Sequence, residues 1–231
     1  MDIVPREITK GVYLIGSAGA QDKAGCNVYL LDFGEPVLID AGTGKSFPHI
    51  VANIEALGFN PADIGTVILT HCHVDHTAGA LRFKQRFACR LIMHELDAQV
   101  VEKGDNQLSG GNWFKISLSP TPIDIKLSGE LNVLRFNGQE LNCLHTPGHS
   151  PGSLSLYADV AGKRILFGQD IHAPILKEYH CDAYAWQRSM QKLLALKADI
   201  LCEGHMGIFE PAEEVDKFIE KYISVHLAQE R

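Results

Sequence analysis

The chain has 231 residues, of which 45% are hydrophobic and 21% charged, an ordinary balance for a globular protein with a sizeable core. Its 21 basic and 28 acidic side chains give a net charge of −7, which argues against the basic face that nucleic acid binding needs. No run of about 18 apolar residues appears, so we expect no transmembrane helix and no membrane partner. We predict a single domain spanning residues 1–231.

The cysteines and the N-terminus predict a cytoplasmic protein. None of the six cysteines forms a CxxC pair, and a chain of this length does not need disulfides, so we expect reduced thiols. The first ten residues lack the apolar core of a secretory signal. The sequence indicates no oligomeric state.

Short apolar stretches separated by Gly, Pro and Asp predict the elements of the first half. Gly58 follows the first predicted helix and is typical of a helix end. In chain order we expect three strands, a helix, a strand, a helix, a strand and a helix, over residues 12–16, 27–32, 36–41, 46–57, 66–70, 76–87, 90–93 and 94–102.

Residues 103–130 form the least regular stretch. They hold several glycines and prolines together with Trp113 and Phe114. A long loop in a compact domain is often functional, for example as a substrate lid, but a plain surface excursion fits equally well.

Strands resume after this stretch. We expect four strands, a helix, a strand and a last helix, over residues 131–136, 140–145, 153–157, 164–167, 184–196 and 199–202 and from Pro211 onward. Residues 37–40 and 165–170 both read as an apolar strand that ends in an acid, which hints at two similar halves. Sheet packed on sheet and covered by helices would bury such strands.

A dense cluster of candidate metal ligands directly follows the strand predicted at 66–70. His71, His73, Asp75 and His76 fall within six residues. Neutral imidazoles and carboxylates are typical zinc ligands, and the cluster is too dense for a plain polar turn.

Further candidates stand where later strands end. His145 and His149 lie in a Pro- and Gly-rich turn, Asp170 ends a strand, and His205 follows another strand between two glycines. Because these strand ends can meet at one edge of a sheet, their side chains could converge on a single metal centre.

The order of these motifs, HxHxDH, TPGHS, GxD and GH, resembles that of the metallo-β-lactamase superfamily of metallohydrolases, over nearly the whole chain to Gly207. The resemblance implies an α/β fold, the four-layer αβ/βα sandwich, with the metals at one edge. It implies three ligands for the first metal, three for the second and one carboxylate bridging both, namely His71, His73 and His149, then Asp75, His76 and His205, then Asp170.

The same resemblance implies supporting roles for nearby residues. Asp40 is expected to hold the site by hydrogen bonding rather than by ligation. His149, and not His145, matches the ligand of the TPGHS motif, and His145 is expected to be structural. Cys72 occupies a variable position of HxHxDH and is expected to be a bystander.

The implied chemistry is hydrolysis. Two zinc ions, with iron or manganese as possible substitutes, would acidify a bridging water for attack on an acyl carbonyl, and Asp75 is the implied proton acceptor. We expect a small-molecule ester, thioester or lactone as substrate, as in glyoxalase II and lactonase relatives. Glyoxalase II relatives carry a long C-terminal helical part, and because 24 residues follow Gly207 here we expect no counterpart of it.

Several alternatives stay open. Lactonases of this superfamily carry a tyrosine after the bridging aspartate, for which Tyr179 and Tyr184 are candidates, with His172 and His180 in the same loop. A persulfide dioxygenase of the same fold would use one iron on His71, His149 and Asp170. A β-lactamase fits less well because that class is generally exported, and a metal-binding scaffold without catalysis is the remaining alternative.

Overall fold

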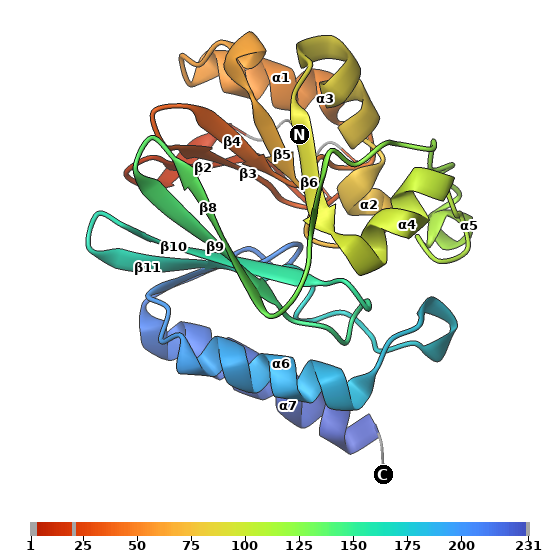
Figure 1. The fold of residues 1–231 in the computed structure, drawn as a ribbon. Helices are drawn as coiled ribbons and strands as arrows, with labels where there is room; N and C mark the ends of the chain where they lie inside the picture. The colour runs from red at the N-terminus through yellow and green to blue at the C-terminus, as the bar shows by residue number, and fades with distance from the viewer. Residues whose placement is uncertain (1–3, 20–21, 230–231) are drawn as a thin grey trace.

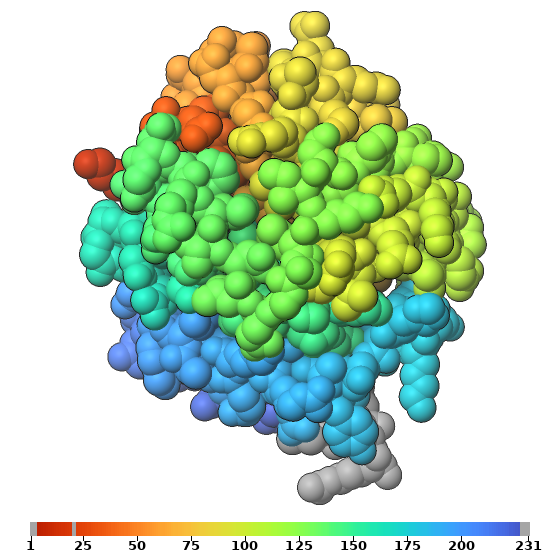
Figure 2. All heavy atoms as spheres, in the orientation of Figure 1, coloured from red at the N-terminus to blue at the C-terminus, as the bar shows by residue number. Residues whose placement is uncertain are grey.

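The computed structural model describes residues 4–19 and 22–229. Two β-sheets pack face to face, and helices cover the outer face of each, which gives the predicted four-layer αβ/βα sandwich (Figure 1). In Figure 2 the two helical layers lie at opposite ends of the molecule, and green residues of the middle of the chain cover the front between them. Among the described helices, none combines the length and apolar character that crossing a bilayer requires.

The first sheet has seven strands in chain order, and the second has six. The strands of the first sheet are β1 (Arg6–Thr9), β2 (Val12–Gly16), β3 (Val28–Asp32), β4 (Pro36–Ile39), β5 (Thr66–Ile68), β6 (Arg90–His94) and β7 (Ile125–Leu127). Those of the second are β8 (Leu131–Phe136), β9 (Gln139–His145), β10 (Leu154–Val160), β11 (Lys163–Phe167), β12 (Ile200–Cys202) and β13 (Ile208–Phe209).

The helices lie between the strands along the chain, and each sheet has its own helices. With the 3-10 turns η1 and η2 they are α1 (Phe47–Ala56), η1 (Pro61–Asp63), α2 (Val74–Thr77), α3 (Ala80–Phe87), α4 (Glu95–Lys103), α5 (Gly111–Phe114), η2 (Lys177–Tyr179), α6 (Ala183–Ala195) and α7 (Ala212–Gln229). Helices α1 to α4 pack on the first sheet, and α6 and α7 cover the second (Figure 1).

Side-chain alternation along the strands builds three apolar layers. On β3, Leu30 faces helices α1 to α4, whereas Tyr29 and Leu31 face the second sheet. On the second sheet, Leu166 and Leu201 pack against α6 and α7. Both faces of the central strands are therefore buried, which explains why their sequences are continuously apolar.

In both sheets, the strand that is followed by an aspartate has the same kinds of neighbouring strands. In the first, β2, β3 and β4 pair antiparallel, and β5 then joins β4 in parallel after a helical crossover. In the second, β9, β10 and β11 pair antiparallel, and β12 joins β11 in parallel after α6. Asp40 and Asp170 follow β4 and β11, and both adopt left-handed backbone angles, with φ of 63° and 55°.

Some elements differ from the sequence prediction. The helix predicted over 76–87 is two helices, because the chain turns at Gly79 between α2 and α3. Strands β1, β7 and β13 were not predicted; they have two to four residues each, too few for a clear period of two. The irregular stretch 103–130 contains α5 and β7.

Candidate metal centre

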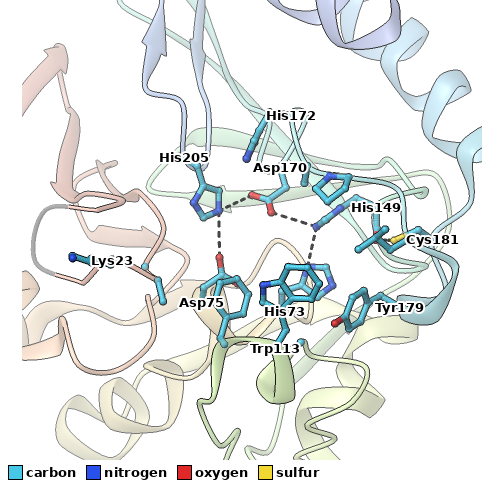
Figure 3. A pocket seen from close by; sticks show the side chains of 17 residues that line it. Lys23, His73, Asp75, Trp113, His149, Asp170, His172, Tyr179, Cys181 and His205 are labelled. Carbon is cyan, nitrogen blue, oxygen red and sulfur yellow. Dashed lines mark hydrogen bonds and ion pairs between the residues drawn. The ribbon is translucent and has the colours of Figure 1, made fainter. Parts of the chain in front are cut away.

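Seven side chains from both halves of the molecule converge at one edge of the sandwich. His71 and His73 lie in the turn after β5, and Asp75 and His76 lie on α2. The other three come from the second sheet, where His149 lies between β9 and β10, Asp170 follows β11 and His205 follows β12. Figure 3 shows the five of them that line a common cavity.

The first group of side chains is His71, His73, His149 and Asp170. The Nδ1 atom of His73 lies 3.1 Å from Nε2 of His71 and 2.9 Å from Nε2 of His149. The Oδ2 atom of Asp170 lies 3.3 Å from Nε2 of His149 and 3.7 Å from that of His71. All four residues are buried.

The second group is Asp75, His76 and His205, joined by the same aspartate. The Oδ2 atom of Asp75 lies 3.4 Å from Nε2 of His76 and 3.3 Å from Nε2 of His205. The Oδ1 atom of Asp170 lies 3.2 and 3.1 Å from the same two nitrogens. One carboxylate thus faces both groups, with a different oxygen toward each.

The donor set of both groups fits divalent metal ions. Ligand atoms around a tetrahedral ion with bonds of 2.0–2.2 Å stand about 3.3–3.6 Å apart, and the separations here run from 2.9 to 3.7 Å. Imidazole nitrogens that face one another cannot all be hydrogen-bond donors. The buried Oδ1 atom of Asp170 also accepts no hydrogen bond. A cation would be a suitable partner for these lone pairs.

Asp40 orients one of these imidazoles. Its Oδ2 atom accepts a hydrogen bond at 2.7 Å from Nδ1 of His76, which leaves the Nε2 lone pair facing the second group. Its Oδ1 atom accepts from the backbone N–H of Thr70 at 2.9 Å. Asp40 therefore contacts the site by hydrogen bonding and lies in neither of the two groups described above.

The electrostatic balance of the site favours neutral imidazoles in the first group and a positive charge near the second. Burial and the facing imidazole of His149 lower the pKa of His73 to about 3. Burial opposes protonation of His205, but the carboxylates of Asp170 and Asp75 outweigh it and raise its pKa to about 11. For Asp75, burial favours the neutral form, yet His76 and His205 hold its pKa well below the usual range.

A buried aspartate on α4 holds the two loops that carry the first group. Asp97 accepts hydrogen bonds from the backbone N–H of Cys72 at 2.8 Å, from that of Gly152 at 2.6 Å and from the Ser150 hydroxyl at 2.6 Å. Cys72 lies between His71 and His73, and Ser150 follows His149. Sequence reasoning missed Asp97, because its partners lie 25 to 55 residues away.

A second buried acid, Glu203, lies directly before the GH motif, and the sequence analysis assigns it no role. Its Oε2 atom accepts the backbone N–H groups of His205 and Met206 at 2.7 and 2.8 Å. Its Oε1 atom accepts from Nδ1 of His172 at 2.8 Å. Glu203 thus fixes both the loop that carries His205 and the ring of His172, which lines the cavity.

The remaining sequence candidates separate into two sets. Tyr179 lines the cavity, with its ring 5.9 Å from that of His73. His180 is exposed and lines a neighbouring hollow, and Tyr184 is 71% exposed at the start of α6, outside the cavity lining. His145 lies away from the ligand groups, stacked on His94 at 4.0 Å between ring centroids, with its Nε2 bonded to the carbonyl of Pro151.

Comparison with known proteins agrees with this geometry. A family model described as the metallo-beta-lactamase superfamily matches residues 22–205. The chain is similar to a probable metallo-hydrolase of Methanocaldococcus jannaschii, with 32% identity over 130 residues that cover 56% of this chain and 61% of the relative. It is also 24% identical to an acyl-coenzyme A thioesterase of Gallus gallus, over 95% of this chain and 86% of the relative.

Solved structures share the fold. A metallo-beta-lactamase from Cronobacter sakazakii, a HARLDQ motif mutant, aligns with a TM-score of 0.83 and 24% identity, over 98% of this chain and 96% of that chain. The aligned region in the Methanocaldococcus relative is less than two thirds of that protein's length.

Proposed function

The chain belongs to the metallo-β-lactamase superfamily, and from this premise we propose that it is a hydrolase with two metal ions that cleaves an ester, thioester or lactone. The observation that carries the proposal is the sharing of Asp170 between two ligand groups in one cavity. Two sets of buried donors around one carboxylate suit a dinuclear centre better than a single ion.

The residues named above would hold the ions. The first ion would take His71, His73 and His149, the second would take Asp75, His76 and His205, and Asp170 would bridge them. Bound divalent ions would supply Lewis acidity, which acidifies water and polarises a carbonyl. The chain itself holds the imidazoles in register through Asp40, Asp97 and Glu203.

We assign the proton-accepting role to Asp75. Its carboxylate lines the cavity, where a group on the substrate or a water molecule could reach it. Cys181, which lines the cavity, does not compete for a nucleophilic role. Burial raises the pKa of the Cys181 thiol, and its Sγ donates to the carbonyl of His149.

Zinc is the metal that we propose, because imidazoles and carboxylates are ligands that catalytic zinc sites use, with iron or manganese as possible substitutes. The thioesterase activity in the name of the Gallus gallus relative supports a thioester as the first substrate to try. We also propose a cytoplasmic location, which agrees with six free cysteines among the described residues.

The alternative of a one-iron persulfide dioxygenase would need only His71, His149 and Asp170. The convergence of Asp75, His76 and His205 on the other oxygen of the same aspartate favours two ions. We therefore rank hydrolysis first.

A double substitution tests the proposal. His71→Ala with His73→Ala should abolish hydrolysis of acetyl thioesters and 4-nitrophenyl esters, because two of the three imidazoles of the first group are lost. His180→Ala, an exposed residue outside the ligand groups, should leave the rate within about twofold. Undiminished hydrolysis by the double variant would overturn the proposed function.

A further inference from the structure

The cavity beside the ligand groups has chemically different sides. Its volume is about 280 Å³. In the view of Figure 3, His172 and His205 lie in the upper part of the cavity lining, and Trp113 and Tyr179 lie in the lower part. Phe114, next to Trp113 in the sequence, and Leu176, whose carbonyl accepts the N–H of Tyr179, also line the cavity. We call the set of Trp113, Phe114, Leu176 and Tyr179 the apolar wall.

The aromatic side chains of the apolar wall are only partly buried by the rest of the protein. Trp113 is 65% exposed and Phe114 37% exposed, although a globular domain buries most of its large aromatic side chains. Single exposed apolar residues are ordinary, but a group of them beside a polar ligand cluster marks a binding surface.

The segment that carries the two aromatic residues is held firmly. The carbonyl of Ser109 accepts the N–H of Val74, the residue next to His73, at 2.8 Å. The side chain of Asn106 accepts the N–H of Leu118 at 2.7 Å. A Cβ at Gly111 would lie 2.6 Å from the carbonyl oxygen of Ile116, so the turn closes tightly around α5. The exposure of Trp113 is thus imposed by an ordered loop.

The other two residues of the apolar wall come from the loop after Asp170. Leu176 and Tyr179 stand at the start and end of η2, where the N–H of Tyr179 donates to the carbonyl of Leu176 at 3.1 Å. The ring of Tyr179 meets that of His73 edge-on. The apolar wall is therefore continuous with the ligand groups, and a group bonded to the reacting carbonyl would contact it.

We propose that the apolar wall binds the acyl group of the substrate, so that the site prefers esters or thioesters of apolar acids of about six to eight carbons. This inference rests on the proposed hydrolase function. A cavity of 280 Å³ holds about nine atoms of the size of a water molecule. A chain of this length fills the cavity, so a bulky polar leaving group would have to extend beyond it.

Acyl chain length gives the first test. The probes are 4-nitrophenyl esters from acetyl to decanoyl, which share one leaving group. For the metal-loaded wild type, kcat/KM should rise by up to about fourfold per methylene and level off near eight carbons. Trp113→Ala should lower kcat/KM for the octanoyl ester at least tenfold and for the acetyl ester less than twofold.

Leu131→Ala is the matched control, because Leu131 is also exposed but lies on β8, away from the cavity. It should leave the chain-length profile unchanged. Zinc content and Tm of Trp113→Ala should equal those of the wild type, which separates substrate binding from damage to the site.

A second series keeps the acetyl group and lengthens an alkyl leaving group. Dependence on the leaving group, with none on the acyl chain, would overturn the inference and assign the apolar wall to the leaving group. A flat acyl profile in an enzyme that hydrolyses acetyl esters would overturn it while leaving the hydrolase function intact. Absence of hydrolysis for every ester and thioester would instead count against the function itself.

Discussion

The hydrogen bonds of Asp97 link the fold to the ligand geometry. Asp97 is buried and accepts three hydrogen bonds, which offset the cost of removing its carboxylate from water. Here the donors belong to the two loops that carry His71, His73 and His149. The loops are thereby fixed before any ion binds, so little ordering remains for binding to accomplish.

Asp97→Asn should lower zinc affinity about 10- to 100-fold, because the amide group presents a donor where Cys72 or Gly152 also donates. Competition with a chromophoric chelator measures the change. Asp124→Asn is the matched control, since Asp124 also accepts a backbone N–H, that of Leu91 at 2.8 Å, but lies at the start of β7. Equal affinities in the two variants would contradict the role of Asp97.

A pair of stacked histidines predicts acid sensitivity of the fold. Burial, together with the facing ring of His145, lowers the pKa of His94 to about 4. Between pH 6.5 and 4, His94 therefore binds a proton in the unfolded chain, where its pKa is near 6.5, but stays neutral in the folded chain. Stability is therefore lost as pH falls from 6.5 towards 4.

His94→Asn should remove this loss, which amounts to about 1–2 kcal/mol between pH 6.5 and 5. An asparagine oxygen can still accept the N–H of Leu96, as Nδ1 of His94 does at 3.3 Å. Urea unfolding of the wild type and of His94→Asn at pH 6.5 and 5 gives the pH dependence of the free energy of unfolding of each protein. The absolute stability changes with the lost ring stacking, so the comparison is the pH dependence; identical dependence in both proteins would refute the role of His94.

At the scale of elements, the turn between α2 and α3 docks the HxHxDH segment on the first sheet. The N–H of Ala41 donates to the carbonyl of His76, and the N–H of Gly79 donates to that of Gly42, both at 2.9 Å. This contact places the His76 ring beside Asp40. Only glycine fits, because a Cβ at Gly79 would lie 2.0 Å from the carbonyl oxygen of Ala41.

Gly79→Ala should destabilise the protein by about 1–3 kcal/mol and weaken zinc binding, since backbone atoms must move apart next to His76. Denaturant unfolding and chelator competition measure the two effects. Gly65→Ala is the control, where a Cβ would meet only the end of the Glu35 side chain, at 3.8 Å. A wild-type stability for Gly79→Ala would show that the turn can relax.

Local patterns explain how far the sequence could predict these elements and the site. The spacing of His71, His73 and Asp75 is local, and buried strands such as β4 are apolar throughout, so both could be predicted. The break at Gly79 depends on a contact with Ala41, far away in the chain. The partners of Asp97, and His172 as a partner of Glu203, likewise become neighbours only through the fold, and a single sequence carries no signal of these contacts.

At the scale of the whole molecule, the candidate centre joins the two sheets. Four of its side chains follow β5 of the first sheet, and three follow strands of the second. Buried carboxylates from both halves, Asp75 and Asp170, meet there and need positive charge nearby. Two divalent ions would supply that charge and tie the halves together.

The number of metal ions per chain tests this account most directly. Elemental analysis of protein purified without added metal should find close to two zinc ions per chain, and His71→Ala with His73→Ala should reduce the number to one or none. One iron per chain, or no metal that survives dialysis in the wild type, would contradict a dinuclear hydrolase.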